Sequence, residues 1–318
     1  MTAVKSVVDE AEARIRAFVR ETPLEHSPVL SDLAHASVHL KLENLQRTGS
    51  FKVRGAFNRL LSLSPEERTR GIVAASSGNH GAAVALAMGT LGIGGLIFVP
   101  ESAPGVKIEN IRRLGGEVRI VGSEGGATEV YARTFAAERG MTYVSPYNDP
   151  LVVAGQGTIG AEIARQLPSV DAFVASIGGG GLISGVAGYL KELRPEIVAV
   201  GVSARNSMAM QASVRARRIV ETEHLPTLSD GTAGGVEPGA ITFESCRTLV
   251  DEFIDVDEDG IRAALRLFID AHHLLCEGAA ALAVAGLLSA KERLRDKNVV
   301  VLICGANIGA ARLKEALE

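Results

Sequence analysis

A short segment around one lysine combines features that suit covalent chemistry. The segment is Ser50-Phe51-Lys52-Val53-Arg54-Gly55, and we expect a helix over 53–61 to begin within it. A lysine in the first turn of a helix, between two apolar residues, is partly desolvated and lies near the positive end of the helix dipole. Both effects lower its pKa and favour the neutral amine, which is nucleophilic. In isolation, Lys52 would be read as a surface lysine whose stem lies along apolar neighbours.

A second segment gathers polar side chains at a turn. Ser76-Ser77-Gly78-Asn79-His80-Gly81 lies between an expected strand at 72–75 and an expected helix at 80–90. Small residues at such a turn let backbone N–H groups converge on an anion at the helix N-terminus. An ordinary helix N-cap with a permissive glycine is the alternative. Two hydroxyls, an amide and an imidazole within five residues are more polar groups than a cap needs.

Two further segments follow expected strands. Gly178-Gly179-Gly180-Gly181 separates a strand ending at Ile177 from a helix starting at Leu182, and its successive N–H groups suit a phosphate. No Lys-Ser/Thr follows, which excludes a Walker P-loop, and no acidic residue about 20 residues on supports a dinucleotide. A monophosphate is the better match, and a merely flexible loop is the alternative. Cys304 ends the last strand, at the sheet edge where ligands collect, although a lone cysteine is more often a buried small apolar residue.

The elements that position these segments alternate along the chain. Short apolar strands followed by helices predict parallel sheets covered on both faces. Turn formers at 146–150 separate two such series, and the aperiodic segment 222–241 is expected to be a long functional loop. We expect strands at 38–42, 72–75, 96–99, 117–121, 172–177, 198–202 and 299–304, and helices at 1–20, 53–61, 80–90, 104–114, 127–139, 156–166, 182–193, 258–272 and 278–290.

The composition narrows the class of protein. With 318 residues, 47% hydrophobic, the chain is long for one core, so two lobes are expected. A net charge of −4 without a basic face argues against nucleic acid as a partner. The three cysteines are odd in number and far apart, which indicates a reducing compartment. The charged N-terminus is unlike a signal peptide, and glycines interrupt the uncharged run 82–100, so we expect a cytoplasmic protein without a membrane span.

Taken together, these segments resemble the fold-type II pyridoxal-phosphate enzymes, specifically the threonine/serine dehydratase and serine racemase family. The resemblance covers nearly the whole chain and also includes Lys41-Leu42-Glu43, 154–158, Leu228-Ser229-Asp230-Gly231 and Glu277-Gly278-Ala279. It implies an α/β fold like that of the tryptophan synthase β chain, with pyridoxal 5'-phosphate between two parallel-sheet lobes. It further implies a large cofactor-binding domain, 1–48 plus 147–318, a small mobile domain, 49–146, and a homodimer.

The resemblance also implies roles for single residues. Lys52 would hold the cofactor and remove the α-proton, and Ser77 would be an acid/base on the opposite face. Cofactor contacts would come from Phe51, Asn79, which bonds the 3'-oxygen, Gly178, Gly179, Gly180 and Gly181, which cradle the phosphate, and Cys304, which faces the pyridine nitrogen. The substrate carboxylate would lie among Ser76, Ser77, Gly78, Asn79 and His80.

The implied activity is elimination from L-threonine or L-serine, giving a 2-keto acid and ammonia. Racemisation of serine is an alternative, as is dehydration of another β-hydroxy amino acid such as 3-hydroxyaspartate or a hydroxyectoine breakdown product. A β-replacement would need a second substrate site, and Lys52 with a full cofactor cradle argues against a non-catalytic binding module.

The sequence departs from the family pattern in ways that limit the resemblance. Most bacterial dehydratases carry Ser where Cys304 stands, and many have Ala where Ser77 stands. The racemase-like metal site needs carboxylates after the strand at 198–202, but the run 203–209 has none, so we expect no metal there. No regulatory domain follows the last strand in this sequence, so isoleucine feedback is not expected.

Overall fold

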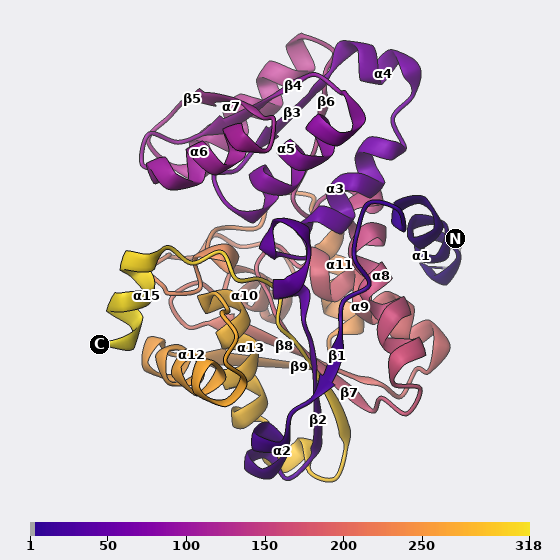
Figure 1. Ribbon diagram of the computed structural model, residues 1–318, viewed down its shortest axis with the longest axis vertical. Coiled ribbons are helices and arrows are strands. Elements are labelled where there is room, and N and C mark those ends of the chain that lie inside the picture. The colour runs from indigo at the N-terminus through magenta and orange to yellow at the C-terminus, as the bar shows by residue number, and fades with distance from the viewer. Residues whose placement is uncertain (1–3) are drawn as a thin grey trace.

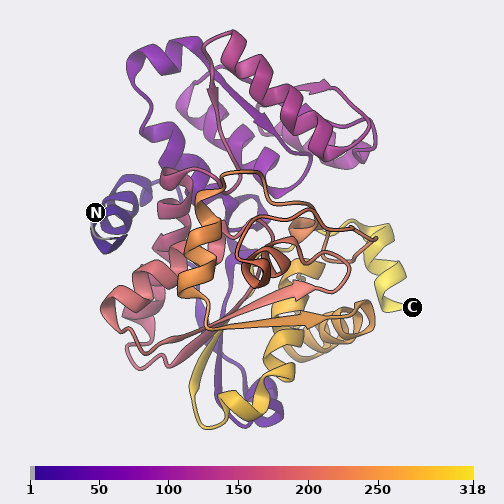
Figure 2. The same cartoon turned by 180° about the vertical axis from the view of Figure 1, so that it is seen from behind.

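Residues 4–318, which the computed structural model describes, form two sheets with helices on their faces (Figures 1 and 2). The larger sheet has the strand order β1-β2-β10-β7-β8-β9 and is parallel except for the β1–β2 pair. The smaller sheet, β5-β4-β3-β6, is parallel throughout. The strands are Leu24–His26 (β1), Ser37–Lys41 (β2), Ile72–Ala75 (β3), Gly95–Val99 (β4), Glu117–Ile120 (β5), Thr142–Tyr143 (β6), Ala172–Ser176 (β7), Val198–Ala204 (β8), Glu252–Val256 (β9) and Asn298–Leu302 (β10).

The helices alternate with these strands, as the βα rhythm of the sequence predicts. They are Val4–Ile15 (α1), Pro28–Ala34 (α2), Lys52–Leu61 (α3), Pro65–Arg70 (α4), Asn79–Leu91 (α5), Gly105–Arg113 (α6), Gly125–Glu138 (α7), Pro150–Gln166 (α8), Gly181–Leu193 (α9), Ala209–Ala216 (α10), Ile241–Leu249 (α11), Glu258–His272 (α12), Gly278–Ser289 (α13), Lys291–Leu294 (α14) and Ala310–Leu317 (α15). Short 3-10 turns lie at Glu43–Leu45, Arg47–Gly49 and Asp230–Thr232. The parallel α/β architecture is therefore confirmed.

One hydrophobic core belongs to the larger sheet and two belong to the smaller sheet, the third of them packing β3 and β4 against α7. The first surrounds β7, β8 and β10, which α13 covers on one face and α9 on the other. Helix α13 is apolar all round and is buried on every side. It approaches the sheet so closely that a Cβ on Gly286 would lie 2.2 Å from Val202. The second core joins α3 and α5 to β3 and β4, so α3 is packed against the smaller sheet as well as against α8.

Most expected elements are confirmed, with shifted ends. The strand at 72–75 and the helix at 258–272 match the expected bounds. The helix expected at 156–166 instead begins at Pro150, because Asp149 caps it by accepting bonds from Leu151 N and Val152 N, and proline suits the first helical position. The last strand ends at Leu302 rather than Cys304, and the first helix ends at Ile15 rather than near Arg20.

Several elements have no counterpart among the expected ones. Strand β9, Glu252–Val256, carries two acidic residues and forms the outer edge of the larger sheet beside β8. Helices α10 and α11 flank the long segment 222–241, which is irregular except for the 3-10 turn at Asp230–Thr232, as expected for a loop. Within residues 4–318, no helix has the length and apolar character to cross a bilayer.

Candidate active site

The segments singled out from the sequence meet at the carboxyl ends of the strands of both sheets. Ser76 follows β3, Gly178 follows β7 and Cys304 follows β10, whereas Lys52 opens α3. A backbone bond of 3.1 Å from Phe51 N to Cys304 O joins the lysine segment to the end of β10. The polar turns and the lysine therefore surround one site, the region that carries ligands in open parallel sheets.

Lys52 is the first residue of α3 and is half-buried. Its Nζ donates a 3.0 Å hydrogen bond to the carbonyl of Pro146 and lies 5.1 Å from the centroid of the Phe51 ring. Burial lowers the pKa of Lys52 to about 8, although nearby Cys304 and Glu277 act in the opposite direction. An amine with this pKa supplies the neutral, nucleophilic form much closer to neutral pH than an exposed lysine does.

The tetraglycine turn is enclosed by protein atoms. A Cβ on Gly179 would lie 2.3 Å from the ring of Tyr147, and one on Gly178 would lie 2.9 Å from the carbonyl of Thr232. Gly180 has a φ of +83°, a left-handed conformation that favours glycine. Thr242 Oγ1 donates a 2.6 Å bond to the carbonyl of Gly179. The N–H groups at the start of α9 have no carbonyl of their own helix to bind, so this fixed turn is suited to hold an anion.

The Ser76–Gly81 turn approaches the site from the smaller sheet. Ser76 Oγ accepts a 3.2 Å bond from Gly78 N, and Ser77 is half-buried in the same turn. His80 is buried, and its Nε2 bonds the carbonyl of Val144 at 2.8 Å. Burial lowers the pKa of His80 to about 3, and the charge of Lys52 acts in the same direction. The imidazole is therefore neutral, with Nε2 already committed to the protein.

Asn79 is held by two side chains from beyond the smaller sheet. Its Nδ2 donates to Glu277 Oε1 at 2.8 Å, and its Oδ1 accepts from Asn307 Nδ2 at 2.6 Å. Asn307 Nδ2 also donates to the carbonyl of Thr48 at 2.7 Å. The amide of Asn79 is thus fixed in one orientation between the turn after β3 and the segment after β10.

Glu277 is a site residue to which the sequence assigned no role. Its buried carboxylate accepts from Asn79 and, through Oε2, from Asn307 N at 3.0 Å. Burial raises the pKa of Glu277 to about 7, and the charge of Asp230 adds to this effect. A single acidic residue within the apolar stretch 274–287 was the available signal, because a carboxyl group is rarely buried without partners.

Tyr147 was missed as part of the site, and the loop 222–241, expected to be a functional loop, lies beside it. The Tyr147 ring lies against the tetraglycine turn, and its hydroxyl accepts a 3.0 Å bond from Glu237 N. The loop also meets the helices of the smaller sheet through ion pairs, Lys107 with Asp230 at 3.0 Å and Arg133 with Glu237. No pattern in the sequence marks Tyr147 as a site residue, because the residues that it contacts are distant in the sequence.

Cys304 is buried at the end of β10, with Sγ 3.7 Å from Ser176 Oγ. Burial raises the pKa of its thiol, so the group is neutral at physiological pH. Cys246 lies behind the tetraglycine turn, and burial raises the pKa of its thiol to about 12. Cys276 is buried as well, and all three cysteines are free.

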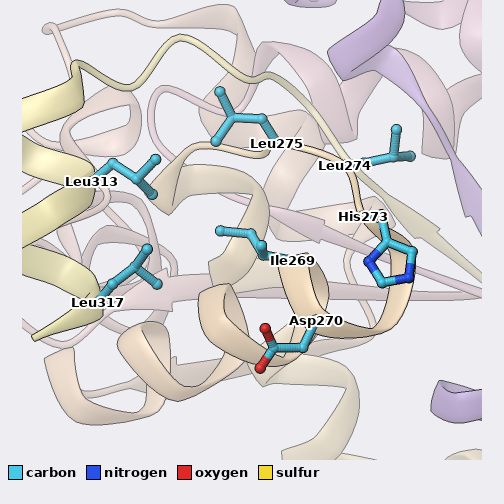
Figure 3. A pocket seen from close by; sticks show the side chains of 7 residues that line it. All are labelled: Ile269, Asp270, His273, Leu274, Leu275, Leu313 and Leu317. Atoms are coloured by element: carbon cyan, nitrogen blue, oxygen red, sulfur yellow. The ribbon is translucent and has the colours of Figure 1, made fainter.

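One apolar pocket lies apart from the candidate active site. An apolar pocket of about 410 Å³ lies between the end of α12 and α15, lined by Ile269, Leu274, Leu275, Leu313 and Leu317 among others (Figure 3). None of the candidate site residues lines this pocket. Within residues 4–318, no group of three or more His, Cys, Asp or Glu side chains is arranged to hold a metal ion.

Comparisons with known proteins agree with this geometry. A family model described as "pyridoxal-phosphate dependent enzyme" matches residues 15–305. The L-threonine ammonia-lyase of Thermotoga maritima is 43% identical over 301 residues, which cover 95% of this chain and 75% of the relative.

Solved structures are similar over almost the full length. The processed form of threonine deaminase isoform 2 from Solanum lycopersicum superposes with a TM-score of 0.93 at 34% identity, covering 98% of this chain and 92% of that one. Maize serine racemase superposes with a TM-score of 0.92 at 30% identity, covering 100% and 97%. Because a lysine with a lowered pKa, a glycine turn suited to hold an anion and a match over most of the chain coincide, this protein belongs to the pyridoxal-phosphate-dependent enzyme family, with the fold-type II architecture.

Proposed function

We propose that this protein is an ammonia-lyase that converts L-threonine or L-serine to a 2-keto acid and ammonia. The observation that carries the proposal is Lys52, a half-buried amine with a pKa of about 8 that lies near the neutral thiol of Cys304. The relative and the neighbour named for threonine ammonia-lyase and threonine deaminase support the choice of reaction.

The residues present fit pyridoxal 5'-phosphate. Lys52 supplies the amine for the aldehyde, and the tetraglycine turn supplies N–H groups for the phosphate. Asn79, fixed by Glu277 and Asn307, presents an amide toward the same region. When bound, the cofactor supplies an electron sink for the carbanion at the substrate α-carbon.

We assign a separate role in the reaction to each of these residues. Lys52 holds the cofactor and, once free, takes the proton from the α-carbon in its neutral form. Cys304, a neutral thiol and a weak donor, would lie beside the cofactor's ring nitrogen and would not keep it protonated. Ser76 and the backbone N–H groups of Ser77, Gly78 and the N-terminal end of α5 bind the substrate carboxylate, because N–H groups at a helix start favour an anion. Loss of the β-hydroxyl followed by hydrolysis gives the keto acid and ammonia.

The decisive test of this proposal is the Lys52→Ala variant. The parent protein is expected to be yellow, and borohydride should fix the cofactor on the peptide containing Lys52. The variant should lose this attachment and at least about 10³-fold in keto-acid formation, since a positioned acid/base group alone contributes 10²–10⁴-fold. Peptide mapping after reduction is the measurement. Cofactor fixed on another lysine of the parent would refute the assignment.

Racemisation of serine is the second candidate, favoured by Ser77 and by the similarity to maize serine racemase. Lys52 reaches one face of the α-carbon, so racemisation needs a second acid/base on the other face, and Ser77 is the proposed group. In a dehydratase, Ser77→Ala should leave elimination from L-serine within about twofold and remove any turnover of D-serine. In a racemase, the same change should abolish the main activity.

The Ser77 experiment is read by two assays on the same samples. Keto acid is measured enzymatically, and the two serine enantiomers are separated chromatographically. A panel of L- and D-β-hydroxy amino acids, including 3-hydroxyaspartate, identifies the preferred side chain. A Ser77→Ala protein that racemises as fast as the parent would contradict the two-face assignment under either function.

The domain division and assembly implied by the resemblance also stand as proposals. We place the large domain at 1–48 plus 147–318 and the small mobile domain at 49–146, supported by the two separate sheets. We propose a cytoplasmic homodimer, with the three free, buried thiols supporting a reducing compartment. Light scattering of the purified protein should give twice the chain mass of 33.3 kDa. A mass equal to one chain would refute the dimer.

A further inference from the structure

A group of four buried charged side chains lies beneath the first turn of α3. Lys41, Glu43, Arg54 and Glu162 come from β2, the 3-10 turn that follows it, α3 and α8, and each is at most 1% exposed. We call these four residues the buried ionic cluster. The mechanism proposed above uses none of them, and they carry two positive and two negative charges, which balance.

Arg54 is the centre of the buried ionic cluster. It binds the Glu43 carboxylate through two bonds, Nε to Oε2 at 2.8 Å and Nη2 to Oε1 at 2.7 Å. It binds Glu162 through two more, Nη1 to Oε1 at 2.7 Å and Nη2 to Oε2 at 2.9 Å. Nη1 also donates to Thr158 Oγ1 at 3.1 Å, and Nη2 donates to the carbonyl of Arg20 at 3.3 Å. The planar guanidinium is thus fixed on both edges, a geometry that lysine does not reproduce.

The other side chains of the buried ionic cluster also have hydrogen-bond partners. Lys41 Nζ donates to Glu162 Oε2 at 2.6 Å, to the carbonyl of Thr22 at 2.7 Å and to Gln166 Oε1 at 2.9 Å. Thr22 Oγ1 in turn donates to Glu43 Oε1 at 2.6 Å. Buried ion pairs are weak contributors to net stability, because desolvation offsets much of their attraction, and apolar replacements are often as stable. Their physical effect here is to define one arrangement of the elements they join.

That arrangement sets where Lys52 stands. Arg54 follows Lys52 by two residues, about 200° around the helix, so its side chain leaves the opposite side of the same turn. Before the lysine, Phe51 N is bonded to the carbonyl of Cys304 at 3.1 Å. Helix α3 itself is packed into the core of the smaller sheet through Val53, Phe57 and Leu60. Arg54 adds a side-chain anchor to the Phe51–Cys304 backbone bond, because it joins the helix start to the turn after β2 and to α8.

We propose that Arg54, clamped by Glu43 and Glu162, is a positioning residue that holds the first turn of α3, and with it Lys52, on the framework of the larger sheet. The inference rests on the proposed function in assigning Lys52 to the cofactor. A positioning role explains why balanced charges are buried at this place. The buried ionic cluster joins four elements at Arg54, two residues after Lys52. The lysine amine then keeps its place near Cys304, at the end of β10 of the larger sheet.

The test compares Arg54→Lys with Arg59→Lys in the cofactor-free full-length protein. Arg59 lies on the same helix and pairs with Asp149 at 2.9 Å, but it is outside the buried ionic cluster. Labelling of Lys52 by a small amine reagent is followed against pH by peptide mass spectrometry. The parent should show a midpoint near pH 8. Arg54→Lys should raise this midpoint by about one unit, because a displaced amine becomes hydrated, whereas Arg59→Lys should leave it unchanged.

Two further measurements make the outcome decisive. The dissociation constant of pyridoxal phosphate should rise about tenfold or more in Arg54→Lys and stay within about twofold in Arg59→Lys, since a misplaced group loses the advantage of preorganisation. A lower melting temperature with an unchanged midpoint and unchanged cofactor affinity would show a merely structural role and overturn the inference. Borohydride mapping of the parent onto another lysine would instead overturn the proposed function.

If Arg54→Lys does not fold, a milder variant tests the same inference. Thr158→Val keeps all four charges and removes one bond to Arg54, the 3.1 Å contact from Nη1, together with the 2.7 Å bond from Thr158 Oγ1 to the carbonyl of Gly155 in the same helix. It should move the labelling midpoint in the same direction by a smaller amount. A folded Thr158→Val protein in which only the melting temperature changes would also overturn the inference.

Discussion

Two glycine-containing turns of this protein share a topology and differ in their surroundings. Each lies between a parallel strand and a helix, at 178–181 after β7 and at 76–81 after β3. A Cβ on Gly179 would lie 2.3 Å from the Tyr147 ring, whereas a Cβ on Gly78 would meet no atom within 4 Å. The first turn is therefore packed into the protein, and the second has open space beside its central glycine.

The two turns are also held in different ways. The tetraglycine turn is enclosed by Thr232, Tyr147 and Cys246, so its backbone has little freedom. The Ser76–Gly81 turn is tied to the larger sheet through the side chain of Asn79, which bonds Glu277 and Asn307. A packed turn suits a phosphate that stays bound, and a turn tied by a few hydrogen bonds suits a substrate that enters and leaves.

The comparison predicts the largest effect for Gly179→Ala. The new methyl group would collide with the Tyr147 ring, so either the ring or the backbone of the turn proposed to bind the phosphate must move. We expect the dissociation constant of pyridoxal phosphate to rise about 100-fold, equivalent to about 3 kcal/mol. Equilibrium dialysis of the cofactor measures it. Cofactor affinity equal to that of the parent would show that the turn is not the rigid part of the site.

Glu277→Gln tests the contact that joins the second turn to the larger sheet. The pKa of Glu277 is about 7 in the folded protein and 4.5 as its ordinary value. The folded state therefore binds the extra proton between these values, and stability falls as pH rises from about 4.5 to 7. This group contributes on the order of 3 kcal/mol to that fall.

The measurement is urea unfolding of the cofactor-free protein at intervals from pH 4.5 to 8. The difference between parent and Glu277→Gln should change across this window and be constant above it, whatever the absolute stability of the variant. A difference that is the same at every pH would mean that Glu277 titrates normally and that its buried bonds to Asn79 are not maintained in solution.

Gly78→Ala is expected to have the smallest effect on the protein and a selective effect on substrate. Because no atom lies within 4 Å of the added carbon, fold and cofactor affinity should stay within about twofold of the parent. The same space is the place proposed for the substrate carboxylate, so KM should rise about tenfold, which corresponds to about 1.4 kcal/mol. Steady-state kinetics give both constants. A variant with weakened cofactor binding would remove the distinction between the two turns.

Local patterns in the sequence predicted the architecture and most of the segments that meet at the site. Short apolar strands and intervening helices have periods that are visible within ten residues, so the parallel α/β fold was correctly expected. Turns rich in glycine and the lysine at the start of α3 are equally local. Strand β9 was missed because its two acidic residues, half-buried in this edge strand, weaken the apolar pattern.

Contacts between distant residues were decided only by the tertiary structure. Glu277 bonds Asn79 across 198 positions, and Arg54 bonds Glu162 across 108. No pattern within a short window reports such pairs, because each partner is read against its own neighbours and appears as an ordinary polar residue. Burial of these charges becomes favourable only when the folded chain brings their partners within hydrogen-bonding distance. For this reason the local pattern singled out Lys52, whereas the buried partners of the neighbouring Arg54 became visible only in the folded chain.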